Sequence, residues 1–548
     1  MNDASEVEYQ LPRSSRKTNG RLPVWLAVLL VIVLLIKLSE LPRPVVSRTA
    51  VRGASGTISQ DADDRAMSML LLITLKTKLF VLQQNVSGIP TGSSQKSAKS
   101  LLDESEKLFK LANYSPASAR RVFIIRGLFH RPLLAPTRLG YLPLQAFAGS
   151  PNISLRNEGN VWVAIANKTV LTPVQIVSMS KQIRRAPGIG WWKYSALELF
   201  YDSQGMTSEA HAYADESRGQ AVSTLGALGL LLVIALFAFF VGAGAIVYLV
   251  ATSRGRKTAI PSPLVAIANG YDPANNKAPD AWPTVPERIR DVDRKLSSTD
   301  LLAIFALYML VPSVLSIMAK GFPGIGRNHL FALRGLLTHY GASIAAGKPN
   351  HPDVAIAIIT TAAYLISAAI PLGCLKWLAV KRGASLRNEL NFTARPVGKN
   401  LVYGLVGYGI GLVVLFVSGF ASSQILRGVP SPPNPAIPLL MGSTSTAAII
   451  ILLAVVSIGA PLTEEPMFRG VLYQGLRMRF GPWPSIVASG FIFGFAHPVG
   501  IAGMVPLAML GCVLAWIAET RKSLFPGMVV HCLQNLGTSA MIILAFTR

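Results

Sequence analysis

Two adjacent carboxylates and two imidazoles lie in the most apolar part of this chain of 548 residues. Glu464 and Glu465 directly follow the apolar run 447–462, and His497 and His531 are the two of the seven histidines that fall inside such runs. An ionisable side chain inside a membrane segment is costly and points to function by default. Taken singly, the glutamates could mark only the cytosolic end of a span, and each histidine could be a satisfied core residue. Their occurrence together favours a buried polar site.

Side chains of these types can hydrolyse a peptide bond. Such hydrolysis needs a base that takes a proton from water, and a buried carboxylate supplies one. It also needs donors aimed at the developing oxyanion, for which an asparagine amide and a histidine N–H are suitable. His531 and Asn535 are four residues apart and share one helix face, whereas Cys532 points elsewhere and is interpreted as a packing residue.

A second spacing of four residues orients the carboxylates. Glu465 and Arg469 can pair along one face of a helix, which leaves Glu464 pointing about 100° away around that helix. Pro461 and Pro466 each remove a backbone hydrogen bond from the same helix. The two prolines therefore predict a broken helix, and a broken helix at membrane depth is tolerated where it lines a cavity.

The elements that must position these residues are membrane-spanning helices, each of which needs about 20 apolar residues to cross roughly 30 Å of hydrocarbon. Glu464, His497 and His531 lie 13, 16 and 9 residues from the cytosolic boundaries of their spans, which corresponds to about 20, 24 and 14 Å along a helix. They can therefore meet at similar depth. The nine candidate runs are 24–38, 225–251, 301–318, 354–372, 401–420, 447–462, 483–499, 500–518 and 524–546.

The composition also indicates a polytopic membrane protein. Hydrophobic residues make up 51% of the chain and charged residues 14%, against about 25% charged residues in a typical soluble domain. The net charge of +25 is distributed in short clusters at the ends of apolar runs, which is the positive-inside pattern. Anionic lipid headgroups, and not nucleic acid, are therefore the expected neighbours. The three cysteines all lie in apolar runs and imply no disulfide framework.

We predict an all-α polytopic protein of the cell membrane with about 8–9 transmembrane helices and a cytosolic N-terminus. The first run follows basic residues and lacks a clear cleavage site, so it is interpreted as a signal anchor and not a signal peptide. Within an inserted, mainly helical extracytoplasmic domain, 66–84 and 99–112 are predicted helices and 161–170 a strand. The predicted units are 1–38, N-terminus and anchor helix; 39–224, extracytoplasmic domain; 225–252, transmembrane helix; 253–300, cytosolic linker; 301–400, further transmembrane helices; and 401–548, the domain that carries the polar site.

Three short motifs in this last unit resemble those of a known family. Glu464-Glu465-Pro-Met-Phe-Arg469, Phe493-Gly-Phe-Ala-His497 and His531-Cys-Leu-Gln-Asn535 are similar to the EExxxR, FxxxH and HxxxN motifs of the CPBP family of CAAX proteases and bacteriocin-processing proteins. The three motifs occur in this order, each on its own apolar run. The resemblance covers roughly 401–548 and does not extend to the extracytoplasmic domain.

The resemblance implies an intramembrane endopeptidase that cuts a membrane-associated protein or a lipidated peptide within the bilayer. Glu464 would be the general base, His497 would hold the attacking water or a metal, and His531 with Asn535 would stabilise the oxyanion. A divalent metal such as zinc, if present, would be held by Glu464, His497 and His531. A glutamate-activated water needs no metal, and both mechanisms are compatible with the sequence.

The remaining motif residues would support the site. Glu465 and Arg469 would orient it, and Phe493, one helical turn before His497, is suited to pack against the imidazole ring. The glycines at 404, 407 and 411 are interpreted as helix-packing contacts.

Two other functions are compatible with parts of this pattern. One is a non-catalytic membrane scaffold or regulator of the same fold, against which the intact motif residues argue. The other is a secondary transporter, since transporters also contain broken helices and buried charges. Transporters usually show internal symmetry, which we do not detect in this sequence.

Overall fold

The computed structural model describes most of the predicted spans and part of the extracytoplasmic domain. The described residues are 23–40, 67–83, 100–101, 103–104, 124, 153–185, 191–255, 295–320, 352–392, 396–426, 440, 445–497 and 499–546. Residues 1–22, most of the linker predicted at 253–300 and most of the helix predicted at 99–112 lie outside them. Within the described part the longer elements are all helices and no strand occurs: α1 (Val24–Glu40), α3 (Met67–Gln83), α7 (Ile153–Ala166), α8 (Pro173–Arg185), α9 (Trp192–Ser203), α10 (Thr207–Gly255), α12 (Ser298–Lys320), α14 (Pro352–Lys381), α15 (Leu386–Glu389), α16 (Val397–Ile425), α18 (Thr446–Ala454), η2 (Val455–Gly459), α19 (Ala460–Glu465), η3 (Pro466–Leu472), α20 (Tyr473–Phe480), α21 (Pro482–Ala496), α22 (Ile501–Arg521) and α23 (Phe525–Phe546).

The predicted all-α polytopic architecture is confirmed. Seven helical segments of the described chain are long and apolar enough to cross a membrane, and two shorter apolar helices, Val24–Leu34 and Pro482–Ala496, coincide with the remaining predicted runs. The first run packs as a helix against α12, with Leu26 fully buried in their shared apolar cluster.

Helix α10 joins the domain predicted at 39–224 to the membrane part without a break. Its 49 residues extend about 73 Å, more than twice the thickness of the hydrocarbon core of about 30 Å. The first turns are polar and pack against α9, where the Trp191 ring N–H donates to the backbone carbonyl of Ser217. The predicted boundary at 224/225 lies inside this helix, at the point where its sequence changes from polar to apolar.

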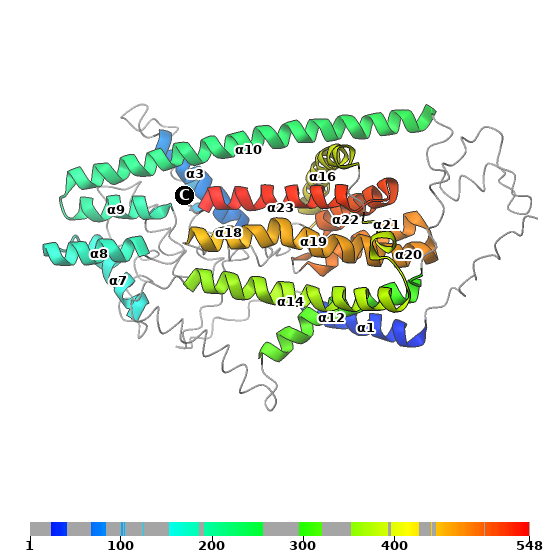
Figure 1. The fold of residues 1–548 in the computed structure, drawn as a ribbon. Coiled ribbons are helices and arrows are strands. Elements are labelled where there is room, and N and C mark those ends of the chain that lie inside the picture. Colours follow the sequence, from blue (N-terminus) through cyan, green and yellow to red (C-terminus); the bar gives the residue numbers. More distant parts are fainter. Residues whose placement is uncertain are drawn as a thin grey trace, which may run out of the picture.

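The described helices of the 39–224 domain share an apolar core of their own. Trp162 of α7, Trp191 beside α9 and Phe200 of α9 are almost completely buried in it. Figure 1 shows α7, α8 and α9 gathered at one end of the molecule, beside the beginning of α10 and the end of α23.

The strand predicted at 161–170 is wrong. Residues 161–166 continue helix α7, and the chain then turns before α8 begins at Pro173. Val161, Trp162, Ala164 and Ile165 are buried, and this spacing follows one side of a helix, whereas a half-buried strand buries alternate residues. The β-branched residues of this run suggested a strand, but packing against the core of the 39–224 domain determined the helix.

The last turn of α23 also belongs to that core. Ile542 and Ala545 pack in the same apolar cluster as the tryptophans of the 39–224 domain. Lys78 of α3 is fully buried beside them, and its Nζ donates to the Ala545 carbonyl and the Thr224 hydroxyl, both at 3.2 Å. A cation at the carboxyl end of a helix is favourable for the helix dipole. Helix α23 is therefore held at this end by the 39–224 domain.

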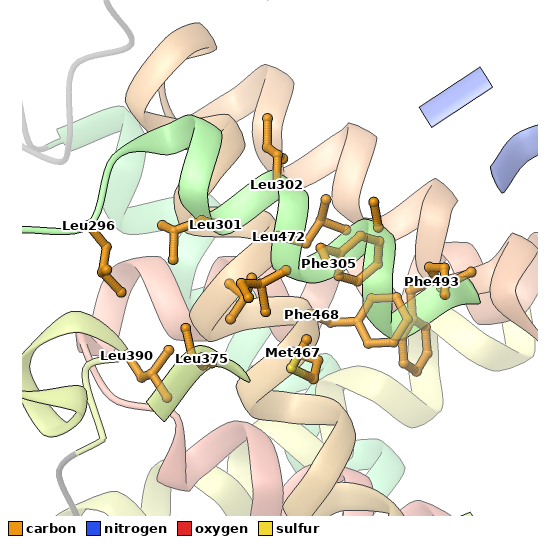
Figure 2. Close-up of a cluster of buried hydrophobic side chains, with 14 of the residues drawn as sticks. Leu296, Leu301, Leu302, Phe305, Leu375, Leu390, Met467, Phe468, Leu472 and Phe493 are labelled. Atoms are coloured by element: carbon orange, nitrogen blue, oxygen red, sulfur yellow. The ribbon is translucent and has the colours of Figure 1, made fainter. Parts of the chain in front are cut away.

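A separate apolar cluster fixes the membrane helices around the predicted site (Figure 2). It brings together side chains from α12, α14, η3, α20, α21 and the segment that follows α15. Phe468 is at its centre, with its ring 5.2 Å from that of Phe305 and 5.0 Å from that of Phe493, measured between centroids. Helix η3, which directly follows the two glutamates, is thus held by packing on several sides.

Glycines let α16 approach its neighbours closely, as predicted. A Cβ added at Gly404 would lie 2.6 Å from Cβ of Val529, and one at Gly407 would lie 2.8 Å from Cδ1 of Ile517. Both distances are shorter than real carbon–carbon contacts, so only glycine permits this separation between α16 and helices α22 and α23.

Candidate active site

The two glutamates lie near the middle of one long helical span, Thr446–Phe480. In this span the short helix α19, which ends at Glu465, is flanked by two π-helical stretches, η2 and η3. Pro466, the first residue of η3, has no N–H to donate to the preceding turn, and the backbone here adopts wider π-type turns in place of the predicted break. Such turns within α-helices occur frequently at functional sites. The glutamates therefore do not mark the end of the span.

Glu465 is the centre of a buried network of charged and polar groups. Its Oε1 accepts hydrogen bonds from Nη1 of Arg469 and from Nδ1 of His531, each at 2.9 Å. Glu465 is 0% and Arg469 2% exposed. The guanidinium also donates to the Gly511 carbonyl at 3.3 Å and lies over the ring of Phe493, 4.4 Å from its centroid. Because one carboxylate oxygen accepts a hydrogen bond from both partners, Glu465 fixes Arg469 and His531 relative to each other.

Both histidines present Nε2 to Glu464. Nδ1 of His531 bonds to the Glu465 carboxylate, and Nδ1 of His497 bonds to the Phe493 carbonyl at 2.7 Å. Since these oxygens only accept hydrogen bonds, Nδ1 carries the proton in both rings. Nε2 of each ring is then free to interact with a group near Glu464.

Glu464 faces both of these nitrogens. Its Oε2 lies 3.9 Å from Nε2 of His497 and 3.9 Å from Nε2 of His531, and it is buried with no hydrogen-bond partner. A separation of this size is too long for a direct hydrogen bond, and in such a position a bridging water has to be considered. One acidic oxygen and two imidazole nitrogens thus surround a position that a water molecule or a polar substrate atom can take.

The fit of these three atoms to a metal can be tested by their spacing. Imidazole nitrogens and a carboxylate oxygen are ligands that zinc accepts, and two ligands on one tetrahedral zinc ion lie about 3.4 Å apart. The observed separations from Glu464 are 3.9 Å, and the described residues contain no group of three or more His, Cys, Asp or Glu side chains spaced to hold a metal ion. The arrangement therefore fits a water molecule better than a zinc ion.

Phe493 packs against both histidines, not only against the one in its own motif. Its ring centroid lies 4.6 Å from that of His497 and 5.7 Å from that of His531. Phe468 meets it edge-on, and Arg469 covers it. The ring consequently restricts the orientation of both imidazoles.

Asn535 lies one turn after His531 on α23, as its spacing predicts. Its amide nitrogen donates to the backbone carbonyl of Val456 in η2 at 2.8 Å. One of its two N–H groups is therefore used to hold α23 against the π-helical turn that precedes Glu464, and the predicted role as an oxyanion donor depends on the other. Cys532, between these two residues, is a free thiol.

Two residues beside Glu464 were not identified from the sequence. The hydroxyl of Tyr364, on α14, lies 3.3 Å from Oε1 of Glu464 and 2.6 Å from the hydroxyl of Thr463. Neither residue belongs to the three motifs. Their only signal in the sequence is that they place hydroxyl groups in apolar spans, where Ser and Thr are also common packing residues.

A comparison with protein families bears on this same region. Residues 446–537 match the family model described as Rce1-like, the type II CAAX prenyl endopeptidases. This segment is similar to the CAAX prenyl endopeptidases. The match confirms the resemblance predicted from the three motifs, and it contains all seven residues that they predict for the site.

The Rce1-like segment forms only part of the molecule. It begins at α18 and ends within α23, so α10, α14 and the helices of the 39–224 domain lie outside it. Neither the curated proteins nor the solved structures that were compared with the chain gave a match.

Proposed function

We propose that this multi-pass membrane protein is an intramembrane endopeptidase in which Glu464 activates a water molecule. The observation that carries the proposal is the buried, unpartnered Oε2 of Glu464, at 3.9 Å from Nε2 of both His497 and His531. The similarity of residues 446–537 to the CAAX prenyl endopeptidases supports the same reaction.

In the proposed reaction, water bound against these three atoms loses a proton to Glu464 while its oxygen attacks the scissile carbonyl carbon. Glu464 then passes this proton to the leaving nitrogen. His497, with Nδ1 held by a backbone carbonyl, accepts a hydrogen bond from the water at Nε2 and orients it. The protein thus supplies a base and a fixed water position, which lowers the entropy cost of the attack.

His531 is the proposed donor to the oxyanion. The carboxylate of Glu465 holds this ring in place through the bond to Nδ1. The proposed role requires a hydrogen on Nε2 as well, which donates to the developing negative charge. The second N–H of Asn535 adds to this donor set. We expect Asn535→Ala to remove about 3 kcal/mol of transition-state stabilisation and so to lower turnover on the order of 100-fold.

The proposed substrate is a membrane-associated protein or peptide, with a prenylated CAAX terminus as the specific candidate. The similarity of the Rce1-like segment to the CAAX prenyl endopeptidases favours a prenylated chain, and the buried site requires a substrate that enters from the bilayer. We further propose that the protein resides in the cell membrane with its N-terminus in the cytosol, because its basic clusters lie at one side of the predicted spans.

The decisive test is Glu464→Gln, which keeps the shape of the side chain and removes the base. Full-length protein is reconstituted into liposomes and assayed on a quenched fluorescent peptide with a farnesylated CAAX terminus. In parallel, the membrane and secreted proteomes of cells that carry either form are compared. We expect cleavage to be abolished while the variant remains inserted and abundant.

A matched control is Cys532→Ala, which removes the thiol next to His531 and should retain turnover. Equal turnover by the wild type and by Glu464→Gln, on the peptide and on every candidate from the proteomes, would refute the catalytic role. The non-catalytic scaffold would then be the better interpretation.

A further inference from the structure

Tyr364 brings a hydroxyl group to the proposed base from a helix outside the Rce1-like segment. It lies on α14, which packs against α18 in the bundle, and its oxygen is 3.3 Å from Oε1 of Glu464. The same oxygen is 2.6 Å from the hydroxyl of Thr463, which in turn lies 3.1 Å from the Gly459 carbonyl and 3.0 Å from that of Ala460. Oε1 thus has a partner, whereas Oε2 has none.

Each of the two hydroxyl groups has only one hydrogen to donate, and this fixes the directions of the hydrogen bonds. An ionised carboxylate only accepts, so Tyr364 must donate its hydroxyl hydrogen to Glu464 when the base is ready to act. The Tyr364 oxygen can then accept from Thr463. When Glu464 carries a proton on Oε1, the carboxyl group donates to Tyr364, Tyr364 donates to Thr463, and Thr463 donates to a backbone carbonyl of the preceding turn. Both arrangements use the same positions of the heavy atoms.

We propose that Tyr364, supported by Thr463, is a positioning residue that holds Oε1 of Glu464 toward α14 and so directs Oε2 at the two imidazoles. The inference rests on the proposed function, in which Glu464 is the base. It makes α14 part of the active site, although this helix lies outside the segment that resembles the endopeptidases.

Rotation of the carboxylate is the motion that this contact opposes. Nothing else is bonded to Oε1 of Glu464 in the described part of the chain, and Pro466, two residues later, leaves the following helical turn in the wider π form. In the proposed role Tyr364 acts on the reaction only through Glu464, so its loss should reduce kcat and leave KM unchanged. A hydrogen bond to a charged group has a strength that corresponds to a loss of roughly 10- to 100-fold in kcat.

The experiment compares variants of the reconstituted full-length protein on the farnesylated CAAX peptide. Tyr364→Phe keeps the ring and its packing, and Thr463→Val keeps the shape of the side chain, while each removes a hydroxyl. We expect both to lower kcat with unchanged KM and an unchanged melting temperature. Thr463→Ser restores a hydroxyl and should recover turnover. The double variant should be no slower than Tyr364→Phe, because the two hydroxyls act as one unit.

The matched control is Thr361→Val, one turn earlier on α14, whose buried hydroxyl has no hydrogen-bond partner. It should turn over the peptide like the wild type. A wild-type kcat for Tyr364→Phe, beside an inactive Glu464→Gln, overturns this inference alone. A fall in melting temperature that accounts for the lost turnover, or a failure of Thr463→Ser to restore it, also overturns it. Equal turnover by the wild type and Glu464→Gln overturns the proposed function, and this inference with it.

Discussion

Replacement of Glu465 by glutamine tests whether the buried network carries both the stability and the activity of the site. Glutamine keeps the shape of the glutamate side chain but removes the negative charge that both Arg469 and His531 contact. Removal of one partner of a buried ion pair costs about 3–5 kcal/mol, because the other charge stays buried without compensation. Arg469 is 2% exposed but keeps its bond to the Gly511 carbonyl and its place over the Phe493 ring. We therefore expect a loss near 3 kcal/mol, a large share of the 5–15 kcal/mol that stabilises a typical domain.

A double variant separates the two consequences. Glu465→Gln with Arg469→Met removes both charges, so the isolated buried charge that makes the single variant unstable is absent. The melting temperature should then return to near that of the wild type. Turnover should not return, because Nδ1 of His531 still lacks the carboxylate that holds and orients its ring.

The assay is thermal unfolding of the purified protein in detergent, followed by intrinsic fluorescence, with turnover measured on the same preparations. Asp215→Asn is the control, because it breaks an exposed pair with Arg218 at 2.8 Å and such pairs contribute about 0–1 kcal/mol. An unchanged melting temperature for Glu465→Gln would show that Arg469 does not need this charge. Full recovery of turnover in the double variant would refute the argued role of Glu465 toward His531.

Three further predictions follow from other parts of the structure. Burial lowers the pKa of Lys78 to about 8. Between about pH 8 and pH 10 the folded protein has therefore lost this proton, whereas the unfolded chain still binds it. The stability of the wild type relative to Lys78→Met should consequently increase as the pH rises through this range. Its pKa shift sets the limit of this gain at about 3 kcal/mol, and melting temperatures of the two proteins that stay parallel across this range would contradict it. A Cβ at Gly242 would lie 2.0 Å from the backbone of α16, whereas one at Gly244 meets nothing within 4 Å; Gly242→Ala should therefore lower stability by roughly 1–3 kcal/mol and Gly244→Ala should not. Single cysteines at exposed positions in 39–224 and 253–299 should react with an impermeant reagent from opposite sides of the membrane, and labelling of both from one side would contradict the proposed orientation.

The sequence by itself determined the features that depend on local chemistry. Apolar runs of nearly 20 residues identify membrane helices because a buried backbone in lipid must satisfy its own hydrogen bonds. The spacing of Glu465 and Arg469 predicted a contact along one helix, and this pair forms at 2.9 Å. The three motifs identified a family resemblance over roughly 401–548, and the family model matches residues 446–537 of this segment. Each of these features depends on residues close together in the chain or on composition.

The tertiary structure decided how these helices present their side chains to one another. Spans of similar depth need not face each other, and only packing brings His531 to Glu465, Asn535 to Val456 and Tyr364 to Glu464. The register between helices is fixed by non-local contacts, such as the close approach of the α16 glycines to α22 and α23, which no spacing within one helix reveals. The same holds for α7, where the tertiary core overrode a local preference for strand. The two prolines predicted an irregular span. The structure shows that the helix continues through wider π-type turns and does not end there, and this outcome depended on the helices packed around it.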